Sequence, residues 1–199
     1  SRFIIELEPR LKEIGLVLSV DVTAPDGSET WSMCFDRNVI GDVADYLVFM
    51  GYDQYGTSSA KPGTTAGLNW VEKSLQKIIQ YDEVDTEKII LGIPFYTRQW
   101  TIASDGKIKD RSPVSMMNIK IPNNVEKQWD DTLKQYYIEY ASGKNTIKMW
   151  IEDGASIKEK VALVTKYNLG GAACWKKDME TSNIWSIIKT ELANTSTEK

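Results

Sequence analysis

Short apolar runs alternate with stretches of helical periodicity along the chain. Residues 16–22 (LVLSVDV) are rich in branched apolar side chains and stop at a loop signal, residues 24–27 (APDG), so they predict a buried strand. Gly15 separates this run from a preceding helical pattern, in which Pro9 predicts a kink or a late start. The apolar positions of that helix are Phe3, Leu7, Leu11 and Ile14.

The same order of helix and strand recurs further along the chain. The predicted helices cover residues 36–43, 71–79 and 157–167, the predicted strands cover residues 46–50, 88–93 and 172–175, and a last helix runs through Ile184, Ile187, Ile188 and Leu192. Pro94 stops one of these strands, and Gly170 and Gly171 precede the last. Ser156 and Glu159 form a capping-box pattern at the start of the helix before that strand.

Strands that alternate with helices indicate an α/β fold with parallel pairing, because parallel neighbours need long crossover connections. Four such units can be recognised, whereas a closed barrel of eight units needs roughly 250 residues, so the sheet is either open or half of a barrel. Residues 97–149 break the rhythm and predict a small inserted α+β element. It contains a hairpin, since residues 136–140 and 146–150 flank a turn signal at residues 142–145 (SGKN).

The composition removes several classes of chemistry. The chain of 199 residues contains no histidine, which excludes a histidine general base, a Ser-His-Asp triad and the common histidine-bearing zinc sites. Its two cysteines, Cys34 and Cys174, are too far apart in sequence for a CxxC metal site, and we interpret both as buried thiols without a disulfide. We therefore expect no metal and no cofactor.

The charge pattern and hydropathy exclude two kinds of partner. The net charge is -4, and the basic residues form no stripe of the kind that binds nucleic acid. No apolar run approaches the roughly 18 residues that indicate a membrane span. Residues 1–10 do not resemble a secretory signal.

Polar and aromatic residues follow three of the predicted strands. The segments are residues 50–54 (MGYDQ), residues 94–100 (PFYTRQW) and Trp175. In barrels of parallel strands the site is built at the carboxyl ends of the strands, so we expect these side chains to face one mouth. Taken alone, a Tyr-Asp pair after a strand is typical of a solvated loop, and a tryptophan at a strand end is typical of a core. The tryptophans interpreted as packing are Trp31, Trp70, Trp129 and Trp185.

Four motifs follow one another in a set order. Residues 50–53 read Met-x-Tyr-Asp, residues 92–98 read Gly-x-Pro-x-Tyr-x-Arg, residues 150–153 read Trp-Ile-Glu-Asp, and Trp175 closes the series. Together they resemble glycoside hydrolase family 18, the chitinase-like glycosidases, over nearly the whole chain. The nearest resemblance is to bacterial spore and cell-wall members. Motifs that agree in order favour a site at Tyr52, Asp53 and Trp175 over a solvated loop.

The resemblance implies the C-terminal half of a (β/α)8 barrel, with its strands 5 to 8 and a small α+β insertion between strands 7 and 8. We expect residues 1–96 to form the first barrel units, residues 97–149 the insertion, and residues 150–199 the last unit. Glu152 and Asp153, at the start of that last unit, are interpreted as carboxylates at a helix end.

The resemblance also implies hydrolysis of β-1,4-linked N-acetylglucosamine polymers by a retaining, substrate-assisted mechanism, in which the substrate's acetamido oxygen attacks the anomeric carbon. By this carry-over, Tyr52 and Asp53 are the catalytic residues: Tyr52 contacts the acetamido carbonyl and Asp53 a sugar hydroxyl. Trp175 floors the pocket, while Tyr96 and Arg98 bind neighbouring hydroxyls. The predicted substrate-binding residues are Met50, Gln54, Tyr96, Arg98 and Trp175.

The family's catalytic glutamic acid ends an Asp-x-x-Asp-x-Asp-x-Glu motif, which this sequence does not contain. We therefore expect the chain alone to be inactive. An alternative is a chitinase-like lectin that binds sugar without cleaving it, and the barrel residues do not separate chitin from peptidoglycan as the substrate. The resemblance implies a location outside the cell or at the cell wall or spore. Exposed edges of a half barrel predict a homodimer or aggregation.

Overall fold

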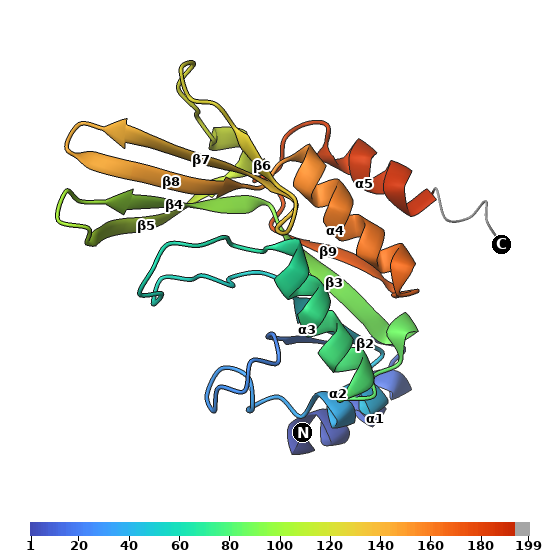
Figure 1. Ribbon diagram of the computed structural model, residues 1–199. Coiled ribbons are helices and arrows are strands. Elements are labelled where there is room, and N and C mark those ends of the chain that lie inside the picture. Colours follow the sequence, from blue (N-terminus) through green and yellow to red (C-terminus); the bar gives the residue numbers. More distant parts are fainter. Residues whose placement is uncertain (194–199) are drawn as a thin grey trace. The chain divides into compact units, whose positions relative to one another are not determined.

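The computed structural model describes residues 1–193 of the chain (Figure 1). Backbone contacts divide it into two compact units. The first contains Ser1–Gly51, Val71–Gly92 and Leu163–Ala173. The second contains Tyr52–Trp70, Ile93–Ala162 and the described residues from Cys174 onward.

The secondary structure of the described residues is mixed α/β. The helices are α1 (Arg2–Glu13), α2 (Arg37–Val43), α3 (Leu68–Gln80), α4 (Gly154–Lys166) and α5 (Ile184–Ala193), with short 3-10 helices η1 (Thr86–Lys88) and η2 (Met116–Asn118). One sheet has the strand order β1 (Ser19–Val22), β2 (Tyr46–Met50), β3 (Ile89–Pro94) and β9 (Gly171–Trp175). The other has the order β5 (Ile108–Ser115), β4 (Tyr96–Ile102), β8 (Asn145–Ile151), β7 (Gln135–Ser142) and β6 (Gln128–Asp130).

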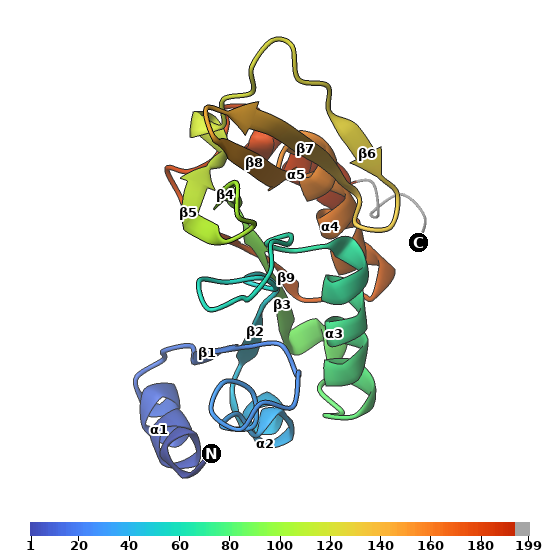
Figure 2. The same ribbon diagram turned by 60° about the vertical axis from the view of Figure 1, so that its left-hand side comes forward.

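In the first unit, helices alternate with parallel strands, as the sequence predicts. Strands β1 and β2 pair in parallel, and so do β2 and β3. The apolar runs supply its core, since Leu47, Phe49 and Leu91 are fully buried. Helices α1 and α2 lie side by side (Figure 2).

The buried strand predicted over residues 16–22 is confirmed only in part, since β1 covers the last four of these residues and Val22 is fully buried. Strand β1 begins only at Ser19, while Leu16 and Val17 are 54% and 67% exposed. An apolar residue before a strand has the same local pattern as one within it, so the run alone does not mark where β1 begins. Helix α1 begins at Arg2, contains Pro9 and has no buried residue, so the proline does not delay its start.

The second unit contains the antiparallel sheet. Strands β7 and β8 form the predicted hairpin, with Ser142 paired to Asn145 at its turn. One face of this sheet carries an apolar cluster of Ile138, Ile147, Met149 and Ile151, against which residues 119, 121 and 125 pack. Residues 97–149 hold strands and the 3-10 helix η2 but no α-helix, so the expected α+β character is wrong there. Period-two alternation dominates this segment and favours strands.

Helix α4 is capped by a residue other than the one predicted. The Asp153 carboxylate accepts hydrogen bonds from the backbone N–H groups of Ala155 (3.0 Å) and Ser156 (3.2 Å). The hydroxyl of Ser156 instead donates to Glu152 at 2.7 Å. The expected capping box is therefore wrong. A carboxylate three residues earlier takes over the role of the serine.

Several side chains expected in the interior lie at the surface. Cys34 is exposed and Cys174 is half-buried, and both are free thiols. Burial raises the pKa of the Cys174 thiol to about 12. Trp31 and Trp185 are 55% and 50% exposed, although Trp185 keeps an edge-to-face contact with Phe95. None of the helices in residues 1–193 is long and apolar enough to cross a membrane.

Candidate functional site

A carboxylate, a phenol and a guanidinium meet in the second unit. Oδ1 of Asp53 accepts hydrogen bonds from the Tyr96 hydroxyl (2.7 Å) and from Nη2 of Arg98 (3.1 Å). Tyr96 and Arg98 alternate along β4, so their side chains project to the same face of that strand. The side chain of Asp53 is 37% exposed and that of Arg98 only 6%, so part of the carboxylate stays accessible to a ligand.

The Arg98 guanidinium is held by three parts of the second unit. Besides Asp53, it donates to the backbone carbonyl of Tyr55 from Nε (3.2 Å) and to that of Arg111 from Nη1 (2.7 Å). Such charge-assisted bonds fix a planar group in one orientation. Arg98 therefore orients the Asp53 carboxylate and ties the segment after it to strand β4.

Tyr96 acts as a proton donor within this cluster. Burial raises the pKa of its phenol well above the ordinary value of 10, and the negative charge of Asp53 adds to the effect. The phenol is protonated at neutral pH, as a tyrosine ordinarily is, and it donates to the Asp53 carboxylate. The ring of Tyr52 packs edge-on against that of Tyr96, with centroids 6.3 Å apart and planes at 70°.

The segment after Asp53 is paired with residues 64–67. The backbone N–H of Gln54 donates to the carbonyl of Thr65 (2.9 Å), and the side-chain oxygen of Gln54 accepts from the backbone N–H of Gly67 (2.9 Å). Nε1 of the buried Trp100 donates to the carbonyl of Gly63 (2.8 Å). A Cβ at Gly63 would lie 2.3 Å from the ring of Tyr55, so only glycine fits there.

A buried ion pair lies at the junction of β8 and α4. The fully buried Glu152 carboxylate accepts hydrogen bonds from Nε2 of Gln135 (2.6 Å), from Oγ of Ser156 (2.7 Å) and from Nζ of Lys160 (3.0 Å). Burial raises the pKa of Glu152, and the Lys160 ammonium opposes this rise. Three hydrogen-bond donors thus compensate for the loss of hydration of the buried Glu152 carboxylate.

This buried network reaches both elements that carry the Asp53 cluster. Gln135 also accepts a hydrogen bond from Thr64, in the segment paired with residues 54 and 55. The hydroxyl of Thr97, between Tyr96 and Arg98 in β4, accepts from the backbone N–H of Glu152 (2.7 Å). The interpretation of Glu152 as a helix-end carboxylate does not predict its buried hydrogen bonds to Gln135, Ser156 and Lys160. The sequence carries a signal for these bonds, since residues 152, 156 and 160 recur at a spacing of four, which brings side chains together at the start of a helix.

The remaining predicted site residues have different places. Gln54 lies beside Asp53 in the paired segment, where its side chain bonds to Gly67. Trp175 ends β9 with its side chain 55% exposed, and its carbonyl accepts from the backbone N–H of Phe95 (2.7 Å). The peptide bond from Trp175 to Lys176 is cis. Met50 ends β2 in the first unit, paired with Gly92.

The structure thus brings Tyr52, Asp53, Tyr96 and Arg98 into direct contact. It places the backbone of Trp175 beside the residue that precedes Tyr96. Within residues 1–193, no group of three or more histidine, cysteine or carboxylate side chains could hold a metal ion. The chemistry that this cluster offers is hydrogen bonding to a polar, uncharged ligand through a fixed carboxylate and flanking aromatic rings.

Comparison with known proteins gives one consistent family. The profile of the family described as Glycosyl hydrolases family 18 matches residues 1–180. An uncharacterized glycosylase of Bacillus subtilis, YvbX, is 25% identical over 89% of this chain and 52% of its own length. The cortical fragment-lytic enzyme of Bacillus subtilis is 26% identical over 96% of this chain and 45% of its own length.

Solved structures agree with this result. A chitinase from Chromobacterium violaceum superposes with a TM-score of 0.82 and 26% identity, over 96% of this chain and 60% of the chitinase. The spore cortex-lytic enzyme SleL of Bacillus megaterium has the same fold, with a TM-score of 0.82 and 23% identity over 96% of this chain and 44% of that enzyme. The chain spans about half the length of the curated relatives it matches.

Proposed function

The chain belongs to glycosyl hydrolase family 18, and on that basis we propose that it supplies the sugar-binding part of a glycosidase for β-1,4-linked N-acetylglucosamine polymers. The observation that carries the proposal is the Asp53 cluster, in which two buried donors fix a carboxylate that remains partly exposed. A preorganised acceptor of this kind suits the hydroxyl and amide groups of an amino sugar.

The proposed mechanism is retaining and substrate-assisted. In this family the substrate's own acetamido group takes the place of the second carboxylate that most glycosidases use. The acetamido oxygen of the bound sugar attacks the anomeric carbon while the glycosidic C–O bond breaks. The leaving oxygen takes its proton from a general acid that this chain does not supply, and water then attacks the anomeric carbon and releases the sugar with its acetamido group restored.

Tyr52 donates a hydrogen bond to the acetamido carbonyl, and Asp53 accepts one from a sugar hydroxyl. The exposed indole of Trp175 offers a flat face to the sugar ring. Arg98, whose guanidinium bonds to protein acceptors, positions Asp53.

The fold of the whole protein is also a proposal. We assign β1, β2, β3 and β9 to strands 5 to 8 of an eight-stranded barrel, with residues 97–149 as the insertion before the last unit. The likeness to 60% of a chitinase at a TM-score of 0.82 supports this assignment. Because the chain contains no Asp-x-x-Asp-x-Asp-x-Glu motif, it has no candidate for the family's general acid. We expect the isolated chain to show no turnover of chitooligosaccharides. Measurable hydrolysis by the pure chain would contradict this.

The relatives suggest two candidate substrates and one location for the whole protein. They include chitinases and cortical fragment-lytic enzymes, so chitin and the glycan of peptidoglycan are both candidate substrates. The spore relatives favour action at the cell wall or spore for the whole protein. A sugar-binding protein without catalysis is the second candidate, since the Asp53 cluster needs no general acid to hold a sugar.

The test is the affinity of this chain for diacetylchitobiose, measured by isothermal titration calorimetry. Asp53→Asn should lower the affinity about tenfold, because the acceptor for a sugar hydroxyl and for Arg98 is weakened. Asp105→Asn is the matched control, since Asp105 is an exposed carboxylate in the turn between β4 and β5. Equal affinities of the wild type and the Asp53 variant, or no binding by the wild type, would refute the proposed function.

A further inference from the structure

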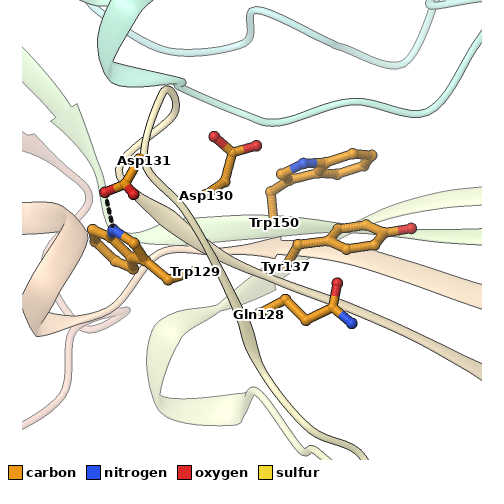
Figure 3. A pocket seen from close by; sticks show the side chains of 6 residues that line it. All are labelled: Gln128, Trp129, Asp130, Asp131, Tyr137 and Trp150. Atoms are coloured by element: carbon orange, nitrogen blue, oxygen red, sulfur yellow. Dashed lines mark hydrogen bonds between the residues drawn. The ribbon is translucent and has the colours of Figure 1, made fainter.

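The turn between β6 and β7, residues 130–135, is closed by its own hydrogen bonds. Asp130 and Gln135 are paired at its base. The Asp130 carboxylate accepts from the backbone N–H groups of Thr132 and Leu133, both at 2.9 Å. Figure 3 shows Asp130 at the start of this β6–β7 turn, where it lines a pocket on the sheet. A side chain that caps its own turn restricts the conformations of that turn, so Leu133 and Gln135 are held in place.

The β6–β7 turn contacts the start of α3 and the residues before it, all within the second unit. The backbone N–H of Leu68 donates to the carbonyl of Leu133 (3.0 Å). A Cβ at Gly67 would lie 2.7 Å from Cδ2 of Leu133, so the two segments are in close contact there. The Thr64 hydroxyl donates to the side-chain oxygen of Gln135. The turn is therefore joined to this segment by backbone, apolar and side-chain contacts.

The side chain of Gln135 has one orientation that satisfies its neighbours. It is fully buried, and its Nε2 donates to the Glu152 carboxylate at 2.6 Å. Glu152 also pairs with Lys160, so it acts as an acceptor and requires the NH2 side of the amide. The amide oxygen therefore faces Thr64, whose hydroxyl donates to it and accepts from the backbone N–H of Ala66 (3.2 Å). The charge of Glu152 thus sets the direction of the hydrogen bond from Thr64.

Hydrogen bonds continue from Thr64 to the Asp53 cluster. The backbone N–H of Tyr55 donates to the Thr64 carbonyl (3.2 Å), and the Tyr55 carbonyl accepts from Nε of Arg98 (3.2 Å). Arg98 also donates to Asp53 through Nη2 at 3.1 Å. A shift of Thr64 would therefore move an acceptor of Arg98 and, through Arg98, the Asp53 carboxylate.

We propose that Gln135, acting through Thr64, is a positioning residue that holds the Asp53 carboxylate in the geometry that accepts a sugar hydroxyl. Gln135 is buried and does not itself touch the sugar. The inference rests on the proposed function, because a sugar hydroxyl is the group that Asp53 is positioned to meet. Its consequence is that loss of the Thr64 hydroxyl weakens sugar binding although Thr64 is buried as well.

Two neighbouring threonines provide a matched pair of variants. Thr64 and Thr65 are 2% and 1% exposed, but the Thr65 hydroxyl has no hydrogen-bond partner among the described residues. Thr64→Val removes the hydroxyl that bonds to Gln135 and nearly keeps the shape of the side chain, whereas Thr64→Ser keeps the hydroxyl. Thr65→Val makes the same change at the next residue, where no hydrogen bond is lost.

Two measurements on these variants test the inference. The NMR signal of the Arg98 Nε–H, recorded on the labelled chain without sugar, reports the bond to Tyr55, and isothermal titration calorimetry gives the affinity for diacetylchitobiose. Thr64→Val should shift the Arg98 signal and lower the affinity about fivefold, because one buried hydrogen bond of the linkage is lost. Thr64→Ser and Thr65→Val should keep the wild-type signal and stay within about twofold of the wild-type affinity. A purely structural role of Thr64 would lower the free energy of unfolding and leave both readings of the folded protein unchanged.

The outcomes separate this inference from the proposed function. If the wild type binds the sugar and Thr64→Val keeps either the wild-type signal or the wild-type affinity, the positioning role is refuted and the proposed function stands. An equal loss of affinity in Thr65→Val would refute the role as well. If Thr64→Val shifts the Arg98 signal but the wild type binds no diacetylchitobiose, Gln135 still positions Asp53 and the proposed function fails. Should Thr64→Val unfold, Gln135→Met must show both changes, or the role is refuted.

Discussion

At the scale of residues, the orientation of the Asp53 carboxylate depends on two buried hydrogen-bond donors, Tyr96 and Arg98. The Tyr96 phenol is protonated at neutral pH, as a tyrosine ordinarily is, and burial raises its pKa further. Arg98 is fixed by carbonyls on either side. The backbone of Asp53 has a φ of 59°, in the left-handed region that few residues other than glycine adopt. A carboxylate held this way needs little rearrangement to accept a hydrogen bond from a ligand.

Tyr96→Phe tests this arrangement. It removes the donor to Asp53 but keeps the ring that packs against Tyr52, so we expect a loss of about fivefold in affinity for diacetylchitobiose, near 1 kcal/mol. Tyr81→Phe is the control, since Tyr81 is 79% exposed. An unchanged affinity in the Tyr96 variant would show that the phenol does not order the carboxylate.

At the scale of elements, β4, β7 and α4 are joined by the buried Glu152 and Lys160. A buried pair is costly to break, because the remaining charge has neither water nor partner. We predict that Glu152→Gln and Lys160→Met each lower the free energy of unfolding by about 3 kcal/mol, measured in urea. The double variant should lose clearly less than the sum, whereas additive losses would show that the two groups do not interact.

A second pair of elements should be sensitive to acid. Glu72 of α3 accepts hydrogen bonds from Lys166 at the end of α4 and from the adjacent Tyr167, and the Lys166 bond lowers the pKa of Glu72. A carboxylate whose pKa is lower in the folded state than in the unfolded state stabilises the protein fully at pH values above the ordinary pKa of 4.5. This stabilisation is lost as the pH falls through the folded-state pKa. Glu72→Gln should therefore flatten the fall in melting temperature below pH 4.5. The same slope in both proteins would contradict this.

The elements also show how far sequence reasoning reaches. Residues 46–50 were predicted as a strand and β2 has those bounds, because a run of apolar residues suits a strand buried on both faces. The apolar run at residues 16–22 does not by itself show that Leu16 lies outside β1 and is exposed, because an apolar residue before a strand has the same local pattern as one within it. Contacts such as Thr97 with Glu152 join residues far apart in sequence and leave no local periodicity. The motifs at residues 50–53 and 92–98 did identify the family.

At the scale of the whole molecule, α1 and the segment between α1 and β1 present apolar side chains to solvent. Phe3, Ile14 and Val17 are 70%, 69% and 67% exposed. Exposed apolar residues beside a sheet edge favour association with a second copy, which would cover both. We predict that light scattering at micromolar concentration gives a mass above the monomer mass of 22.5 kDa. Phe3→Lys with Val17→Lys should restore the monomer, and a monomeric wild type would count against this prediction.

The most direct test of the account is where a sugar binds. Nuclear magnetic resonance of the labelled chain, titrated with diacetylchitobiose, would locate the site by chemical-shift changes. We predict that the largest changes fall on Tyr52, Asp53, Tyr96 and the indole of Trp175, and that they saturate together. Changes confined to other residues, or none at millimolar sugar, would contradict the assignment of the Asp53 cluster as the sugar site.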